Sequence, residues 1–470
     1  MSRPSNPEKS PITAKATLSA PAPAPAPATS NADDDAALEA DLNDLTLEQP
    51  KATGLYEEFE SHEIEVTLAN DSHAAAAATT FEALGLAPEL LKGLYAMNFT
   101  KPSKVQERAL PLLLHDPPTN LIAQSQSGTG KTAAFALTML SRIDYTATNA
   151  PPQAVCMTNT RELALQIVKV VREMGQFTPV KVCMAVKDEV PRGAKVTDHI
   201  VIGTPGTILD LNRKRQLDFK NVKVLVLDEA DAMLDAQNLG EQSRRVRQVM
   251  PKTAQVLLFS ATFPDHVKSF ATAFAPSANM IVLKREEVKV EAIKQFYLRV
   301  KGDKAAKFEK LSDLYGLLTV GQSIIFTQTK ATAMDVAKRM QAEGHQVSVI
   351  TGDLMPADRD QVMADFRSGK SKVLIATNVL ARGIDVPQIN LVVNYDLPVD
   401  EAGRPDLEVY VHRIGRTGRF GRSGVSINFI DGERAMSIQN KIVAHYAMQV
   451  TEMPDDFEAM EKMLREFKFN

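Results

Sequence analysis

Residues 125–132 read SQSGTGKT and decide the fold, because they join an apolar run, Leu121–Ala123, to a segment rich in Ala and Leu. The backbone amides from Gly128 to Lys131 can cradle a polyphosphate, and the positive N-terminal end of the following helix adds to the attraction. Lys131 would reach the β- and γ-phosphates, and the Thr132 hydroxyl would complete a magnesium shell. A strand, a glycine-rich turn and a helix in this order predict a nucleotide site in a parallel α/β sheet.

Short apolar runs separated by helix-length segments continue along the chain. Continuous runs of Val, Ile and Leu are typical of buried parallel strands in β-α-β units. The expected strands of a first series are Leu121–Ala123, Ala154–Thr158, Lys181–Val186, Ile200–Gly203, Val222–Leu227 and Val256–Ser260. Those of a second series are Ser323–Thr327, Gln346–Ile350, Val373–Thr377, Leu391–Tyr395 and Val425–Ile430. Two series predict an α/β protein with two tandem, doubly wound parallel-sheet domains.

The N-terminal part of the chain differs in charge from the rest. Residues 1–80 hold four basic and fourteen acidic side chains, a net charge of −10, whereas the remainder carries a net charge of +6. We therefore expect residues 1–78 to be a mostly disordered extension, Ala/Pro-rich at first and then acidic. Within it, Asp33–Asp44 is either a conditional helix or, as we favour, a solvated acidic segment. Glu63–Leu68 alternates polar and apolar residues and favours an edge strand.

The predicted domain boundaries follow from these patterns. The first domain is expected at residues 79–283, and the second at residues 293–470. Charged residues 284–292 between them are expected to be a hinge. The mildly basic body of the protein leaves a polyanion partner possible.

Composition excludes several classes of protein. A chain of 470 residues with only two cysteines, Cys156 and Cys183, is neither a disulfide scaffold nor a cysteine-based zinc protein. It has no apolar stretch of about 18 residues and no signal-peptide core. We expect an intracellular protein without membrane insertion, and a monomer as the default oligomeric state.

A second chemical motif follows the apolar run Val224–Leu227, which ends in Asp228-Glu229-Ala230-Asp231. Carboxylates at the carboxyl end of a parallel strand lie where such sheets bind ligands. Asp228 would hold Mg²⁺ directly or through water, and Glu229 would orient or deprotonate the attacking water. The alternative is an acidic helix N-terminus without a catalytic role. The accompanying phosphate loop favours the catalytic interpretation.

A third motif, HRIGRTGR at residues 412–419, offers arginines at three-residue spacing in the second domain. Arg416 and Arg419 fall on one helical face and would stabilise the departing γ-phosphate as arginine fingers supplied in cis. A solvated basic helix start and an RNA-phosphate site are the alternatives. The phosphate loop in the other domain favours the fingers.

The set of motifs resembles the DEAD-box ATP-dependent RNA helicases, from Phe81 to about Phe467. DEAD stands at residues 228–231, and the family's coupling motif is matched by SAT at residues 260–262. The motifs for RNA contact are matched by TRELA at 160–164, TPG at 204–206 and TNVLARGID at 377–385, and the adenine-reading Q motif lies within residues 79–107. The resemblance implies two RecA-like domains that close on ATP and single-stranded RNA to remodel RNA–protein particles.

The resemblance also implies a role for each matched position. The ATP site would comprise Phe81, Gln106, Ser125, Gln126, Ser127, Gly128, Thr129, Gly130, Lys131, Thr132, Gly383 and Asp385. The RNA path would comprise Thr160, Arg161, Thr204, Gly206, Arg359 and Thr377. Ser260, Thr262 and His412 would couple the two. Gln106 can make paired hydrogen bonds to an adenine edge and Phe81 can stack on the ring, although Phe81 and Phe99 also suit a core.

Some positions depart from the family pattern. The usual Gly-Gly RNA-contact motif is not visible near Lys187–Arg192, Thr351 replaces a common histidine, and Ala357 replaces the glutamine that precedes Arg359. These departures bear on RNA contacts and leave the ATP chemistry intact.

Other features resemble the mRNA-export branch of the family, which works at the cytoplasmic face of the nuclear pore. Eleven residues, Val399–Val409, separate NYDLP from Tyr410, where most relatives have about five. The branch implies a nucleoporin partner on the first domain, an activator assisted by inositol hexakisphosphate, and residence in nucleus and cytoplasm with enrichment at the pore. A translation-type DEAD-box helicase and a catalytically silent RNA-binding scaffold are the alternatives, and a duplex-DNA translocase is disfavoured.

Overall fold

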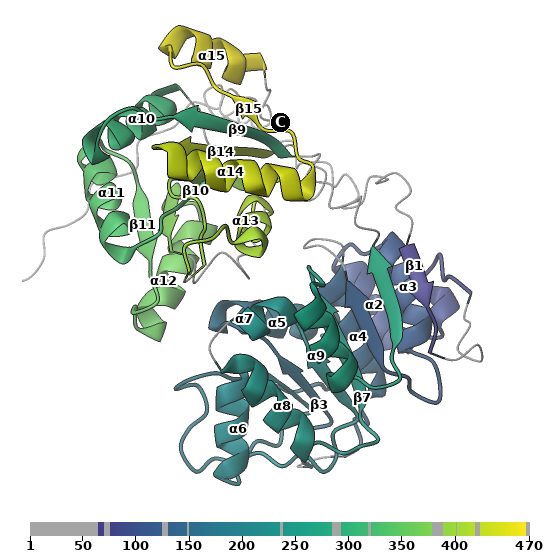
Figure 1. The fold of residues 1–470 in the computed structure, drawn as a ribbon. Coiled ribbons are helices and arrows are strands. Elements are labelled where there is room, and N and C mark those ends of the chain that lie inside the picture. The colour runs from purple at the N-terminus through teal and green to yellow at the C-terminus, as the bar shows by residue number, and fades with distance from the viewer. Residues whose placement is uncertain are drawn as a thin grey trace, which may run out of the picture. The chain divides into compact units, whose positions relative to one another are not determined.

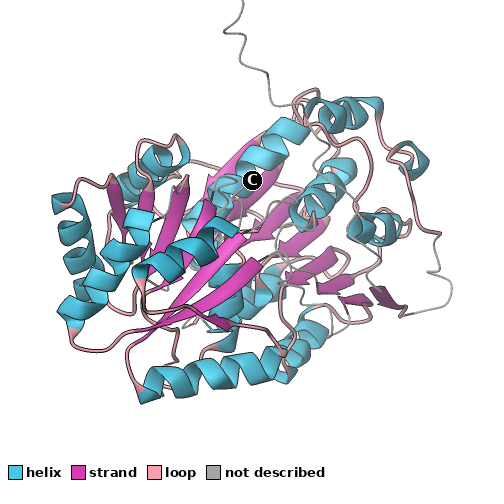
Figure 2. Cartoon of the chain, turned by 90° about the horizontal axis from the view of Figure 1, so that it is seen from above, coloured by secondary structure: helices cyan, strands magenta, loops and turns pink. Residues whose placement is uncertain are grey.

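The structure is a computed structural model, which describes residues 64–69, 76–124, 130–147, 150–235, 238–283, 293–317, 321–377, 389–400, 402–418 and 424–466. Within these residues the strands form one eight-stranded and one seven-stranded sheet, with helices packed along them (Figure 1; Figure 2). The predicted α/β fold with two parallel-sheet domains in succession is confirmed. The predicted hinge at residues 284–292 lies outside the described residues, as do the Ala/Pro-rich stretch and Asp33–Asp44.

The first sheet has the strand order β1-β8-β2-β7-β6-β3-β5-β4. Its strands are β1 (Ile64–Thr67), β2 (Leu121–Gln124), β3 (Ala154–Met157), β4 (Val182–Ala185), β5 (Ile200–Gly203), β6 (Val224–Leu227), β7 (Gln255–Ser260) and β8 (Asn279–Leu283). All pairs are parallel except β1 with β8. Every expected strand of the first series is present, to within two residues at each end.

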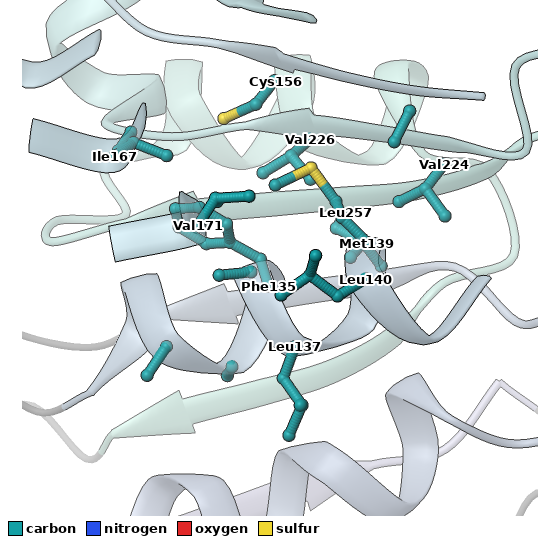
Figure 3. Packing of buried hydrophobic residues seen from close by; sticks show 14 of the residues in the cluster. Phe135, Leu137, Met139, Leu140, Cys156, Ile167, Val171, Val224, Val226 and Leu257 are labelled. Atoms are coloured by element: carbon teal, nitrogen blue, oxygen red, sulfur yellow. The ribbon is translucent and has the colours of Figure 1, made fainter. Parts of the chain in front are cut away.

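Helices connect these strands. They are α2 (Pro88–Ala96), α3 (Lys104–Leu113), α4 (Lys131–Arg142), α5 (Arg161–Met174), α6 (Pro205–Arg213), α7 (Ala230–Asp235), α8 (Leu239–Val249) and α9 (Asp265–Phe274). Figure 3 shows α4 against the sheet, where Phe135 and Met139 pack with Val224, Val226 and Leu257. The other two residues of β6, Leu225 and Leu227, belong to the core cluster on the opposite face of the sheet. Because β6 is buried on both faces, its sequence is continuously apolar rather than alternating.

The edge strand β1 comes from the N-terminal extension. Ile64 to Thr67 pair antiparallel with Leu283 to Met280 of β8. The edge strand predicted from the alternating pattern of Glu63–Leu68 is therefore confirmed. The first sheet consequently includes residues from before position 79, where we expected the domain to begin.

The second sheet is parallel throughout, with the strand order β11-β12-β10-β13-β14-β9-β15. Its strands are β9 (Ile293–Arg299), β10 (Gln322–Phe326), β11 (Val347–Ile350), β12 (Val373–Ala376), β13 (Ile389–Asn394), β14 (Gly424–Ile430) and β15 (Thr451–Glu452). Its helices are α10 (Lys304–Leu317), α11 (Lys330–Ala342), α12 (Pro356–Arg367), α13 (Leu407–Ile414), α14 (Glu433–Tyr446) and α15 (Phe457–Glu466). No helix in the described ranges is both long and apolar enough to cross a bilayer.

Candidate functional site

The turn between β2 and α4 places Lys131 at the first position of its helix. Gly130 caps the helix with φ at 94°, a conformation that favours glycine, and its carbonyl accepts a hydrogen bond from Gln106 Nε2 at 2.9 Å. Lys131 is only 6% exposed, and its Nζ has no hydrogen-bond partner among the described residues. A buried ammonium group without a partner is costly, so this position suits an anionic ligand.

Two buried carboxylates follow β6. Asp228 and Glu229 are 3% and 6% exposed, and Glu229 Oε2 has no hydrogen-bond partner in the described part of the chain. Burial, and next the charge of Glu229, raise the pKa of Asp228 to about 7, while Lys131 opposes that shift. Unsatisfied charges of both signs lie together here. A ligand carrying a divalent cation and a polyphosphate would neutralise both, so the residues present fit Mg²⁺ with ATP.

The strand order explains why these groups meet. In the first sheet β7 lies between β2, which leads to Lys131, and β6, which leads to Asp228. Ser260, the last residue of β7, therefore ends between the two motifs. All three strands are parallel, so their carboxyl ends share one edge of the sheet.

Asp231 joins the three predicted coupling residues. It is fully buried, and its backbone N–H donates to Ser260 Oγ at 3.1 Å. Its Oδ2 accepts from the N–H and the hydroxyl of Thr262 at 3.0 and 2.8 Å. His412 Nε2 lies 3.5 Å from the same oxygen. Ser260, Thr262 and His412 thus converge on one residue, Ser260 through the Asp231 backbone N–H and the other two through its carboxylate. The sequence had offered Asp231 only as the last letter of DEAD.

Glu229, Asp231 and His412 also bring one ligand atom each within 4.8 Å of one another. Within this group, the Asp231 carboxylate already accepts two hydrogen bonds from Thr262 and contacts His412 at 3.5 Å. We interpret the group as part of the coupling network rather than as a separate metal centre.

The Q motif is tied to the phosphate loop. Ser103 and Gln106 form a capping box at the start of α3, with Ser103 N–H donating to Gln106 Oε1 at 2.9 Å. Gln106 Nε2 donates to Gly130, so each end of the amide retains capacity for one further hydrogen bond. Phe81 is 1% exposed within the core cluster, and Phe99 packs partly buried against the same cluster. In this structure both rings have the core environment that was the alternative to adenine stacking.

The predicted RNA contacts follow the carboxyl ends of three strands. Thr160 follows β3 and caps α5 by accepting from Leu163 N–H at 3.2 Å, Thr204 follows β5, and Thr377 follows β12. Gly206 lies in the first turn of α6, where an added Cβ would lie 2.9 Å from Gln242 Oε1.

Both predicted RNA-binding arginines are held by carboxylates. Arg161 Nη2 lies 2.7 Å from Asp360 and 2.5 Å from Glu189, and these two hydrogen-bonded carboxylates raise its pKa. Arg359 Nη1 lies 3.3 Å from Glu162. Sequence reasoning missed these acidic partners. The only signal for two of them is their place directly beside the arginines, in Arg161-Glu162 and Arg359-Asp360.

The finger motif begins on α13. His412, Arg413 and Arg416 are each at most 3% exposed, and Arg416 Nε donates to the His412 carbonyl at 2.9 Å. Thr132 is the second residue of α4, next to Lys131. The remaining predicted site residues, Ser125, Gln126, Ser127, Gly128, Thr129, Gly383, Asp385 and Arg419, lie outside the described residues.

Comparison with known proteins identifies relatives along most of the chain. The family model for DEAD/DEAH box helicases matches residues 103–270, and the helicase conserved C-terminal domain matches residues 306–421. The chain is 57% identical over 387 residues to the ATP-dependent RNA helicase dbp5 of Schizosaccharomyces pombe, covering 82% of this chain and 76% of the relative. It is 54% identical to DBP5 of Mycosarcoma maydis, covering 86% of this chain and 90% of the relative.

Solved structures agree with these relatives. Saccharomyces cerevisiae Dbp5 bound to RNA and ADP BeF3 aligns with a TM-score of 0.79 at 51% identity, covering 83% of this chain and 99% of that one. A singly substituted form of the same yeast protein, bound to Nup159, a Gle1 variant, IP6 and ADP, aligns with a TM-score of 0.60 at 49% identity, covering 81% and 99%. The likeness confirms the expected pair of RecA-like domains.

Proposed function

The chain belongs to the DEAD/DEAH box helicase family, and from that premise we propose that it is an ATP-dependent RNA helicase whose catalytic groups are those described above. The observation that carries the proposal is the buried ammonium group of Lys131, which has no hydrogen-bond partner among the described residues and whose charge acts on the buried Asp228. A catalytically silent scaffold would have no reason to maintain so costly an arrangement. The enzyme hydrolyses ATP to ADP and phosphate.

Each residue has a defined task in hydrolysis. Lys131 binds the β- and γ-phosphates. Asp228 and Thr132 would hold Mg²⁺, Asp228 directly or through water, where the ion would supply neutralisation of phosphate charge. Glu229 orients the attacking water and accepts its proton as the new P–O bond forms and the bond to the ADP oxygen breaks. Arg416 and Arg419 stabilise the charge on the departing phosphoryl group.

The coupling network links hydrolysis to RNA. Asp231 accepts from Thr262 and contacts His412. A displacement of the segment that carries Thr262 or His412 would therefore move Asp231, which lies close to Glu229. Thr160, Arg161, Thr204, Gly206, Arg359 and Thr377 hold the backbone and sugars of single-stranded RNA. Such contacts are independent of sequence, and contacts to the 2′-hydroxyl favour RNA over DNA. Because RNA assembles the site, hydrolysis is slow without it.

The relatives extend the proposal to a cellular role. The protein acts in mRNA export with a nucleoporin and an activator that uses inositol hexakisphosphate, which are partners that the yeast complexes contain. Its place of action is the cytoplasmic face of the nuclear pore. The identity to proteins named DBP5 favours this role over that of a translation-type helicase.

Steady-state ATP hydrolysis by the purified chain tests the enzymatic proposal, with single-stranded RNA, matched DNA, or neither added. We expect strong stimulation by RNA alone. Glu229→Gln should abolish turnover while retaining ATP and RNA in a stable complex, because the substitution removes the proton acceptor but keeps the binding groups. RNA binding that is indifferent both to ATP and to this substitution would support the scaffold instead.

A further inference from the structure

Arg161 is held by acceptors on two elements, the loop after β4 and helix α12. Its guanidinium contacts Glu189 Oε1 through Nη2, and its Nη1 donates to the carbonyl of Lys187 at 3.3 Å. Asp360 of α12 binds the same guanidinium through Nε and Nη2. The Arg161 side chain is 13% exposed, whereas the Glu189 side chain is 41% exposed. The Asp360 side chain is 33% exposed, so Glu189 is the more exposed of the two carboxylate partners of an arginine on the proposed RNA path.

The loop that presents Glu189 spans residues 187–192, which read KDEVPR and contain no glycine. Asp188 adopts φ of 65°, a left-handed conformation that favours glycine and is costly for most other residues. Glu189 N–H donates to the Val186 carbonyl at 3.3 Å, which closes the turn. This turn presents the Glu189 carboxylate to Arg161.

We propose that Glu189 is an affinity-determining residue for RNA, because its carboxylate occupies Arg161 where an RNA phosphate would otherwise bind. This inference rests on the proposed RNA path. A phosphate and a carboxylate offer the same kind of anionic acceptor to a guanidinium, so the two compete for the same donors. The partly exposed ion pair is weak enough for RNA to displace. Glu189 thereby weakens the complex and makes release easier after hydrolysis.

The test compares two substitutions that remove the same charge from the first domain. Glu189→Gln removes the carboxylate at Arg161, whereas Glu173→Gln removes one that faces Lys169 on the same helix, with 47% of its side chain exposed. Binding of a fluorescein-labelled oligouridylate is measured by anisotropy with a non-hydrolysable ATP analogue, over a series of salt concentrations. We expect Glu189→Gln to bind about two- to fivefold more tightly than the unmodified chain.

Salt dependence gives a second readout. If Arg161 gains a phosphate, the slope of log K against log salt should become steeper by about 0.7 for Glu189→Gln. Glu173→Gln should leave the slope unchanged. ATP hydrolysis without RNA should be equal in Glu173→Gln and in the unmodified chain, because Glu173 lies outside the nucleotide site and the proposed RNA path. Equal affinity and slope for the two variants would overturn the proposal.

Arg161→Gln separates this inference from the proposed function. If the unmodified chain fails to bind the oligouridylate, the proposed function itself fails. If it binds, and Arg161→Gln weakens binding while Glu189→Gln has no effect, only the role of Glu189 is rejected. In the double variant the gain from Glu189→Gln should disappear, because its target is gone. A gain that persists would assign the effect to general charge and overturn the proposal.

Discussion

Asp228 makes the stability of the nucleotide-free protein depend on pH. Its pKa is raised to about 7 by burial and by the charge of Glu229, whereas the pKa of Asp in an unfolded chain is about 3.9. The folded state therefore binds the proton more tightly than the unfolded state. The stabilisation is fully present below the unfolded pKa and is lost as pH rises through the folded pKa, at up to about 1.4 kcal/mol per pH unit.

Asp228→Asn removes this titration, so the substituted protein should gain stability relative to the unmodified chain as pH rises. We expect the difference in melting temperature to move in favour of Asp228→Asn by several degrees between about pH 5.5 and about pH 8. Saturating Mg²⁺-ATP analogue should abolish the trend for the unmodified chain. A difference that is flat with pH would show that Asp228 titrates normally.

The site residues differ in how well the sequence could predict them. Lys131, Asp228 and Glu229 stand in motifs whose spacing from apolar strands fixes their place at the sheet edge, so pattern reasoning located them. The role of Asp231 depends on contacts to Ser260, 29 positions away in the chain. Glu189 likewise reaches Arg161 across 28 positions. Such pairings depend on strand order and loop shape, which local sequence does not encode.

Helix α13 is positioned by a buried polar network. The Tyr410 hydroxyl donates to Gln295 Oε1 at 3.0 Å and accepts from Asn428 Nδ2 at 2.8 Å. Asn428 accepts from Asn394, which in turn accepts from Arg413 at 3.0 Å. These bonds tie α13 to β9, β13 and β14. They fix the rotation of the segment that carries the finger motif.

Tyr410→Phe should therefore lower the rate of RNA-stimulated ATP hydrolysis. We expect a severalfold fall in kcat with KM for ATP within about twofold, because a finger acts mainly in the transition state. The matched control is Tyr315→Phe, which breaks a buried bond to Ser323 at 2.6 Å between α10 and β10. Each variant should lose about 1–2 kcal/mol of stability. Equal kcat values for the two variants would show that the Tyr410 hydroxyl contributes only to stability and does not position the finger motif.

The contact between α2 and α5 depends on a glycine. A Cβ at Gly93 would lie 1.9 Å from the backbone carbonyl of Met174, and a backbone group has little freedom to move. Gly93→Ala should therefore destabilise the first domain by roughly 1–3 kcal/mol. Gly316 in α10 has no atom within 4 Å of such a Cβ, so Gly316→Ala should stabilise by about 0.5–1 kcal/mol. Thermal melts of the two variants should shift in opposite directions.

Strands were predictable where burial on both faces makes a continuous apolar run, as in β6. β9 escaped prediction because its sequence is neither continuously apolar nor strictly alternating: exposed Lys294 is followed by two buried residues, Gln295 and Phe296. β8 was missed because its sequence NMIVL begins with a polar residue that is fully buried. That residue, Asn279, accepts from Ala69 N–H through its side chain at 3.0 Å. Strands that depend on such pairings show a weaker pattern than central strands.

Charge is distributed unevenly over the whole chain. Residues 1–60 carry four basic and eleven acidic side chains, whereas residues 81–470 have a net charge of +6. We hypothesise that this acidic charge competes electrostatically with RNA for basic groups of the body. Such competition would lower ATP hydrolysis in the absence of RNA, because it opposes assembly of the site.

Deleting residues 1–60 should raise hydrolysis without RNA, and the gain should shrink as salt screens the attraction. The deletion must end before Ile64, because β1 covers the outer edge of β8. Removing residues 1–70 instead would expose that edge to other chains and lower the melting temperature. Measured at low salt, unchanged hydrolysis after the shorter deletion would reject autoinhibition. A gain seen only with the longer deletion would implicate β1 itself rather than the charge of the segment before it.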